Sequence, residues 1–318
     1  MTAFEDFVAL QARLPGGMLR LGETRIARAL AALRPAIEPP ESFPTIHRCD
    51  LARAWCASRG MPAAWSGRAL VCEGVRHALA LIFGELARRG EPVALPRDVY
   101  PVYWRIAADA GAAAIAVDTF PELAHAFATP ARYVVLPCPL KLHGRDWTDR
   151  ECAAAARWLA GDRRRRLILD GVYSFGEPIA RGVLDLCATD QVIYLDSLSK
   201  GWLHERVFGS AVVPACDLAL WAPIFRAAAP AQRSLFVARA LVAAPRPPLE
   251  AALAELRART IELLESRGIE ARAPRRGYLV PVRIEAGVAL AAHRTLLVPF
   301  AVFGGHGPWS FASALGAA

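Results

Sequence analysis

The stretch VIYLDSLSKGWLHERVFGSAVV, residues 192–213, decides how the rest of the chain is interpreted. An apolar run, 192–195, leads into a segment with two serines, then Lys200, then a glycine. A short apolar run bounded by small residues predicts a buried strand that ends in a tight loop. Ligands of α/β proteins bind at the carboxyl ends of such strands, so we expect Lys200 to lie at a ligand site.

Lysine is rare in this chain, which strengthens the prediction that Lys200 lies at a ligand site. The sequence has 38 lysines and arginines together, and only Lys141 and Lys200 are lysines. An arginine side chain stays protonated, whereas a desolvated lysine amine can lose its proton and form a Schiff base. A lysine kept at the end of a buried strand is therefore expected to serve chemistry. The alternative is a surface lysine that extends from a loop into water.

A second apolar run, RLILDGVYSF (166–175), ends in Asp170, and Tyr173 follows three residues later. A strand with Asp-x-x-Tyr and then a strand with Ser-x-Ser-Lys resembles the fold-type I pyridoxal-phosphate (PLP) enzymes, most closely the class I/II aminotransferases. The resemblance implies an α/β protein. Its large α/β/α domain would hold a mostly parallel seven-stranded sheet, and its C-terminal α+β small domain would be reduced.

The resemblance also implies a role for each motif residue. Lys200 would form the Schiff base with PLP and then shuttle protons. Asp170 would hold the proton on the ring nitrogen, which the ring needs to act as an electron sink. Tyr173 would donate a hydrogen bond to the phenolic oxygen of the ring. The residues expected to hold the phosphate are Ser197, Ser199 and Arg206, with Arg206 able to bind it in a bidentate manner.

Two further cofactor contacts are implied upstream. A predicted strand, Ala69–Cys72, turns at Gly74 into a helix from about Val75 to Arg88. Such a turn lets backbone N–H groups approach a phosphate, which would involve Gly74, Val75 and Arg76; an ordinary turn is the alternative. An aromatic residue of the segment 91–104 would stack on the pyridine ring. Tyr100 matches that position best and Tyr103 second, and either could instead be ordinary core.

The loop in RYVVLPCPLKLHGRDW (132–147) departs from the family. Many relatives carry an asparagine here that contacts the phenolic oxygen of PLP, but this sequence contains no asparagine. Alignment on the glycine at 144 puts Lys141 near that position, whereas alignment on the strand puts Cys138 or Pro139 there. Lys141 would face the cofactor or a substrate anion, or be a solvated loop residue. His143 is either an acid–base group or a plain loop residue.

A second departure concerns the arginine that binds the substrate α-carboxylate in common aminotransferases. After Phe303-Gly304, which fits the family, Pro308-Trp309-Ser310 stands in its place. Another arginine could substitute, the substrate could lack an α-carboxylate with Trp309 as an apolar wall, or the reaction could differ from transamination. The candidate substitutes are Arg233, Arg275, Arg276 and Arg283.

Composition narrows the class of protein. With 318 residues, 54% hydrophobic and 21% charged, the chain can bury a sizeable core. The net charge of +8 comes from scattered arginines, so we expect no nucleic acid partner. The seven cysteines form no CxxC pair, which argues against disulfides or a metal site and favours a reducing cytoplasm. Acidic residues precede any apolar run at the N-terminus, and no run is long enough to span a membrane.

We therefore expect a cytoplasmic homodimer with three segments. Residues 1–45 would form an arm and the start of the small domain, 46–215 the large PLP-binding domain, and 216–318 a helical connection and the small domain. The leading function is a PLP-dependent aminotransferase acting on an amino acid or amine in biosynthesis, with specialised metabolism as one setting. A PLP-dependent lyase or decarboxylase is the enzymatic alternative, and a non-catalytic pseudoenzyme is the rival from another class.

Overall fold

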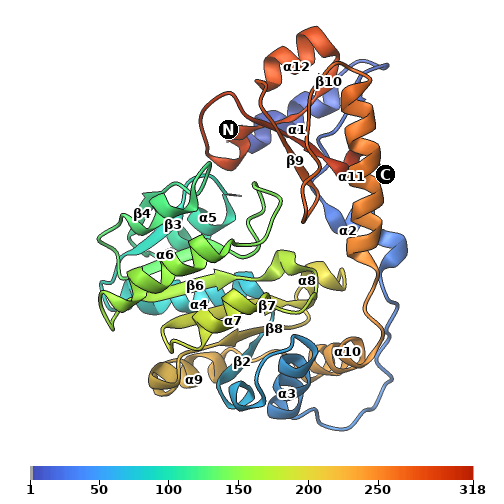
Figure 1. The fold of residues 1–318 in the computed structure, drawn as a ribbon. Helices are drawn as coiled ribbons and strands as arrows, with labels where there is room; N and C mark the ends of the chain where they lie inside the picture. The colour runs from blue at the N-terminus through green and yellow to red at the C-terminus, as the bar shows by residue number, and fades with distance from the viewer. Residues whose placement is uncertain (1–2, 100, 318) are drawn as a thin grey trace.

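The protein is described by a computed structural model that covers residues 3–99 and 101–317. Its centre is a seven-stranded sheet, which lies in the lower part of Figure 1. In spatial order the strands are β2 (Ala69–Cys72), β8 (Gly209–Val212), β7 (Val192–Ser197), β6 (Arg166–Asp170), β5 (Tyr133–Pro137), β3 (Val93–Pro96) and β4 (Ala114–Val117).

Strand β8 runs antiparallel to both of its neighbours, and the other neighbouring pairs of this sheet are parallel. The strands are continuous apolar runs because both faces of the sheet are covered, as in other parallel sheets. In β6, Leu167 and Leu169 face one hydrophobic cluster while Ile168 faces the other. The sequence-based prediction of a mostly parallel seven-stranded α/β sheet is confirmed.

Helices cover both faces of this sheet. One face is packed by α4 (Val75–Arg88), α5 (Val102–Asp109) and α9 (Leu218–Ala227). The other is packed by α3 (Arg48–Ser58), α6 (Asp149–Ala160), α7 (Arg181–Cys187) and α10 (Gln232–Ala243). Helix α6 begins with the capping box that Thr148 and Glu151 predict, because each side chain bonds the backbone N–H of the other. A three-layer α/β/α unit results.

The two chain ends build a second unit above the sheet in Figure 1. Its three-stranded antiparallel sheet has the order β11 (Val298–Pro299), β12 (Ser310–Ser313) and β9 (Leu279–Val282). From the N-terminal side, β1 (Leu19–Arg20) pairs in parallel with β10 (Thr295–Leu296). The helices of this unit are α1 (Ala3–Arg13), α2 (Ile26–Ala29), α11 (Leu249–Glu265) and α12 (Ala286–His293). Buried Phe7 and Leu21 anchor the N-terminal segment in its core.

Short 3-10 turns connect these elements. They are η1 (Ala31–Leu33), η2 (Ala63–Arg68), η3 (Leu123–Phe127), η4 (Val172–Ser174), η5 (Ala215–Asp217), η6 (Phe300–Phe303) and η7 (Ala314–Ala317). Each cysteine is a free thiol, and the described residues hold no cluster of three metal-ligating side chains. Among the described helices, none combines the length and the apolar character that crossing a bilayer requires.

The pattern of residues 23–33 predicts one continuous helix, and this is wrong. Only Ile26–Ala29 and the turn Ala31–Leu33 are helical. The carbonyl oxygens of Glu23 and Thr24 accept hydrogen bonds from the hydroxyls of Ser313 and Tyr278, which a helix would have used internally. Tertiary contacts with the C-terminal unit therefore override the local preference.

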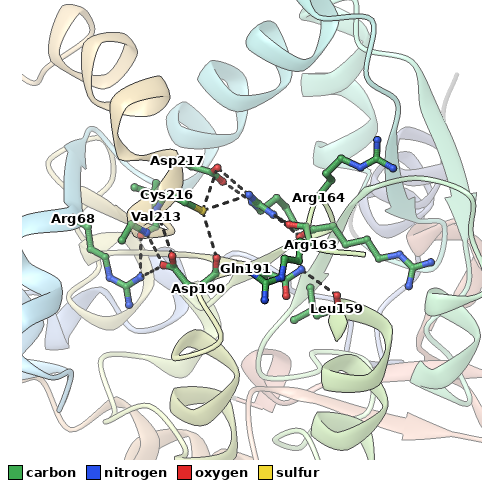
Figure 2. Close-up of polar contacts among 12 residues, drawn as sticks. Arg68, Leu159, Arg163, Arg164, Asp190, Gln191, Val213, Cys216 and Asp217 are labelled. Carbon is green, nitrogen blue, oxygen red and sulfur yellow. Dashed lines mark hydrogen bonds and ion pairs between the residues drawn. The ribbon is translucent and has the colours of Figure 1, made fainter. Parts of the chain in front are cut away.

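Near the amino-terminal ends of β6 and β7, polar side chains join three loops. Figure 2 shows Asp190 between Arg68 and the backbone around Cys216. Arg166, at the start of β6, makes a two-point ion pair with Asp217. This network therefore holds the amino-terminal ends of the parallel strands β6 and β7, while their carboxyl ends lie on the opposite side of the sheet.

A buried ion pair lies near the carboxyl end of β7. The Arg59 and Asp196 side chains are 0% and 1% exposed, with 2.7 Å between Nε and Oδ2. Arg59 also donates to Ser174 Oγ at 2.6 Å and to the Glu177 carbonyl. One guanidinium therefore joins the end of α3, the end of β7 and the loop after β6. Burial makes this junction costly to break, because the remaining charge would lie in a medium of low dielectric constant.

We predict that Asp196→Ala lowers the free energy of unfolding by about 3–5 kcal/mol, because the Arg59 charge is left buried without its partner. Asp185→Ala, which breaks an exposed pair with Arg181, is the control and should change stability little. Urea denaturation followed by circular dichroism measures both. Equal small losses in the two variants would contradict the prediction.

Candidate active site

A cavity of about 510 Å³ lies over the carboxyl ends of β5 and β6, between the central sheet and the C-terminal unit. Pro137 and Asp170, the last residues of these two strands, both line it. Thr24–Ala27 from the N-terminal segment and Tyr278 from the second unit close it on the far side. Its volume is in the range typical of small-molecule and cofactor sites.

Asp170 is buried at the end of β6. Its Oδ1 accepts a hydrogen bond from the Val172 N–H at 3.0 Å, and its Oδ2 accepts one from the Tyr103 hydroxyl at 2.5 Å. Burial raises the pKa of this carboxyl to about 6, although the hydrogen bonds and the Lys200 charge act in the opposite direction. A carboxylate has about four acceptor positions, so Asp170 can accept a further donor from the cavity.

Lys200 lies in the short helix α8 (Leu198–Gly201) that follows β7. Ser197 caps this helix by accepting a hydrogen bond from the Ser199 N–H, and the two serine hydroxyls lie 2.7 Å apart. A Cβ at Gly201 would lie 2.8 Å from the backbone of Phe175, so only glycine lets α8 pack this closely on the loop after Tyr173. The packing brings the two sequence motifs to one cavity.

The electrostatic surroundings of Lys200 favour a reactive amine. Burial lowers the pKa of Lys200, while the Glu205 carboxylate, with Oε1 3.7 Å from Nζ, acts against this shift. A lowered pKa increases the fraction of neutral amine, which is the nucleophilic form. Lys200 and Glu205 both line the cavity.

The turn from β2 into α4 forms one wall. Gly74 is the N-cap of this 14-residue helix, and Gly74, Val75 and Arg76 line the cavity together with Ser199 and Arg206. A Cβ at Gly209 would lie 2.5 Å from the Gly74 Cα, so glycine is required where β8 passes beneath the turn. The helix N-terminus, two guanidiniums and a hydroxyl make this wall suited to a phosphate.

Lys141 enters the cavity from the loop between β5 and α6. Its Nζ lies 4.7 Å from the ring centre of Tyr173 and 5.4 Å from those of Tyr278 and Phe303. Burial, together with the charge of Lys200, lowers the pKa of Lys141 to about 7, although the Asp170 carboxylate acts in the opposite direction. The side chain therefore lies where the large sheet and the C-terminal unit meet.

The remaining sequence-based candidates fall in different places. His143 lines the cavity, and its Nε2 donates to the Thr119 carbonyl at 2.8 Å, so this ring nitrogen is engaged in the loop. Trp309 and Ser197 do not line it; the Trp309 ring packs 5.1 Å from that of Phe120. Tyr100 lies outside the described residues. Tyr103, the second candidate for stacking on the ring, instead bonds Asp170.

Sequence reasoning missed three features of the site. It gave no role to Glu205, to the bond between Tyr103 and Asp170, or to the wall formed by Thr24–Ala27. Glu205 has one sequence signal, since it is a carboxylate adjacent to the proposed phosphate ligand Arg206. The other two features depend on contacts between distant segments and leave no local pattern.

The arrangement fits PLP. It combines a buried carboxyl for the ring nitrogen, an amine of lowered pKa for the aldehyde, and a helix N-terminus with two arginines for the phosphate. All of these groups line one cavity of suitable volume. The donor set therefore suits this cofactor.

Comparisons with known proteins agree at the level of the fold. The chain is similar to an aromatic aminotransferase from Pyrococcus horikoshii, with a TM-score of 0.69, 16% identity, and coverage of 98% of this chain and 94% of that one. It is similar to the Escherichia coli protein YbdL, described with a methionine aminotransferase function, with a TM-score of 0.73, 17% identity, and coverage of 99% and 96%. An aspartate aminotransferase from Rhizobium meliloti gives a TM-score of 0.72, 14% identity, and coverage of 98% and 90%.

No family model and no curated protein sequence matches the chain. The similarity is thus one of structure at low sequence identity, and it covers nearly the whole length of the proteins compared. The chain has the fold-type I aminotransferase fold in a divergent form. This confirms the fold that Asp170, Tyr173 and the Ser-x-Ser-Lys segment predict.

We predict that the PLP-free protein loses stability as the pH rises from about 4 to about 6. The pKa of Asp170 is about 6 in the folded state against an ordinary value of 3.8, so the folded state binds this proton more tightly. The two-unit difference corresponds to about 3 kcal/mol, lost as the pH rises through this window and constant above it. Urea denaturation at several pH values measures the effect.

The variant Asp170→Asn lacks this titration and serves as the comparison. Its free energy of unfolding, relative to that of the native protein, should rise by about 2–3 kcal/mol between pH 4 and pH 7. Asp185→Asn, at an exposed position, controls for general charge effects. Parallel stability curves for the native protein and Asp170→Asn would contradict the raised pKa.

Proposed function

We propose that this protein is a PLP-dependent aminotransferase that acts on an amino acid or amine. The observation that carries the proposal is the convergence of Lys200 and Asp170 on one cavity, from the ends of neighbouring strands. The structural similarity to aminotransferases of aromatic amino acids, aspartate and methionine supports it. We further propose a cytoplasmic homodimer with a role in biosynthesis.

The proposal gives each residue of the cavity a task. When bound, PLP supplies an electron sink that stabilises negative charge at the substrate carbon bearing the amine. Asp170 would hold a proton on the ring nitrogen, and Tyr173 would donate a hydrogen bond to the phenolic oxygen. The phosphate would be held by the cavity-lining residues Gly74, Val75, Arg76, Ser199 and Arg206, with Ser197 keeping Ser199 in position.

Lys200 has two tasks in this proposal. As a neutral amine, Lys200 would be the residue that anchors the cofactor through its aldehyde. With a substrate in place, its free amine would move a proton at the substrate carbon that bears the amine. Its lowered pKa suits both tasks, because the amine must be neutral to attack and to accept a proton. Glu205 supplies a nearby carboxylate that stabilises the protonated form.

A PLP-dependent lyase or decarboxylase is the second candidate, and one observation favours it. None of Arg233, Arg275, Arg276 and Arg283 lines the cavity, so the expected substitutes for the carboxylate-binding arginine are absent from it. Arg276 instead pairs with Asp146 at 2.9 Å. A pseudoenzyme is disfavoured, because a chain without catalysis has no need to keep a buried carboxyl and a desolvated amine in one cavity.

We predict that the native protein binds PLP with a visible absorbance band that borohydride removes, and that Lys200→Ala lacks this band. The band requires a covalent bond to an amine, and Lys200 is the amine that the proposal assigns. Lys141→Ala is the matched control, since it removes the other lysine and should keep the band. A band retained in Lys200→Ala and lost in Lys141→Ala would contradict the assignment.

The same sample separates the two candidate functions. Addition of an amino donor should convert the native band to the spectrum of the pyridoxamine form and release a keto product, if the enzyme transfers amines. Release of carbon dioxide or an eliminated group, with the band restored, would favour the lyase or decarboxylase. Unchanged spectra with every donor tested would favour the pseudoenzyme.

A further inference from the structure

Both lysines of this chain line the same cavity. Positive charge elsewhere in the sequence comes from arginine, so the presence of two lysines in one cavity indicates a specific chemical role for each. The proposed function uses Lys200 and leaves Lys141 without a role. Its loop lies between β5 and α6, and its Nζ faces rings from both structural units.

The other cations of the cavity are assigned elsewhere. Arg76 and Arg206 lie at the start of α4 and beside Ser199, on the wall suited to phosphate. Arg25 is 66% exposed and makes a two-point ion pair with Glu23, with both N···O distances 3.0 Å. Lys141, by contrast, is a described cavity cation that lies away from the phosphate wall and close to the Tyr278 ring of the C-terminal unit.

We propose that Lys141, as an ammonium, binds a carboxylate of the substrate and so determines which substrates the enzyme accepts. The inference rests on the proposed function, because it places this carboxylate in the cofactor cavity. The Lys141 amine lies within 5.4 Å of the ring centres of Tyr173, Tyr278 and Phe303, so the part of the substrate next to its carboxylate meets mainly aromatic and apolar groups. The substrate class is therefore an amino acid with an apolar side chain.

Electrostatics make this binding dependent on pH. Lys200 from α8 and Asp170 from β6 are titratable groups that act on the Lys141 amine, and the rings of Tyr173 and Tyr278 face it. Lys200 lowers and Asp170 raises the pKa of Lys141, which burial brings to about 7. A bound carboxylate favours the charged form and raises this pKa. At pH 8, where the free amine is mostly neutral, carboxylate binding must therefore take up a proton.

The test is isothermal titration calorimetry of PLP-loaded protein with 3-phenylpropionate, a carboxylate that lacks an amine. Loading with PLP occupies the phosphate wall, so Arg76 and Arg206 do not compete for the probe. Titrations at pH 8 in two buffers of different ionisation enthalpy measure the protons taken up. The variants are Lys141→Met, which removes the charge, and Lys141→Arg, which keeps a charge that does not titrate.

The native protein should take up protons as it binds the probe at pH 8, and its affinity should fall by up to about tenfold from pH 6 to pH 8. Lys141→Arg should bind with less proton uptake and a flatter pH dependence, because its guanidinium stays charged throughout this range. Lys141→Met should bind about 10- to 100-fold more weakly, as expected for loss of a charge-assisted hydrogen bond. Equal affinity and equal proton uptake in all three proteins would overturn the inference.

Two outcomes separate this inference from the proposed function. A protein that takes up PLP but binds the carboxylate independently of residue 141 overturns the inference and leaves the proposed function standing. A protein that fails to take up PLP but binds the carboxylate through Lys141 overturns the proposed function and supports the anion site. Thermal unfolding of Lys141→Met and Lys141→Arg identifies loss of binding that comes from misfolding.

Discussion

The ion pair between Arg59 and Asp196 is the constraint on which the site depends. Asp196 directly precedes the Ser197–Lys200 segment, and Arg59 also holds Ser174 and Glu177, just after the segment that carries Asp170 and Tyr173. One buried guanidinium thus holds both the segment that carries Lys200 and the segment that carries Asp170. Separating the buried ion pair would leave a charge without its partner and lower the stability of the fold, so these segments have little freedom to move. Preorganisation of this kind is what a covalent cofactor site requires.

Desolvation then sets the chemistry of the cavity. It raises the pKa of Asp170 and lowers those of Lys200 and Lys141, because burial penalises every charged form. All three groups are brought closer to neutrality at physiological pH. A carboxyl and an amine whose pKa values are shifted toward neutral pH gain and lose protons readily, which suits them to proton transfer. With ordinary pKa values, the carboxylate would stay deprotonated and the ammonium would stay protonated. One physical cause thus tunes groups of opposite charge for the same reaction.

The parts of the fold that follow from local patterns could be predicted from the sequence. The strand Ala69–Cys72, the helix Val75–Arg88 and the capping box at Thr148 depend on neighbours within a few residues, and all are confirmed. The turn after Glu23 could not be predicted, because its carbonyls bond Ser313 and Tyr278 from the other end of the chain. The bond from Tyr103 to Asp170 escaped prediction for the same reason, since 67 residues separate its partners.

The most direct test of the account uses the scarcity of lysine. Borohydride reduction of the PLP-loaded protein fixes the cofactor to its amine, and cleavage after arginine places the two lysines in separate peptides, 133–145 and 182–206. Mass spectrometry then identifies the labelled peptide. We predict the added mass on residues 182–206, at Lys200. A label on residues 133–145, at Lys141, or no label on either peptide, would contradict it.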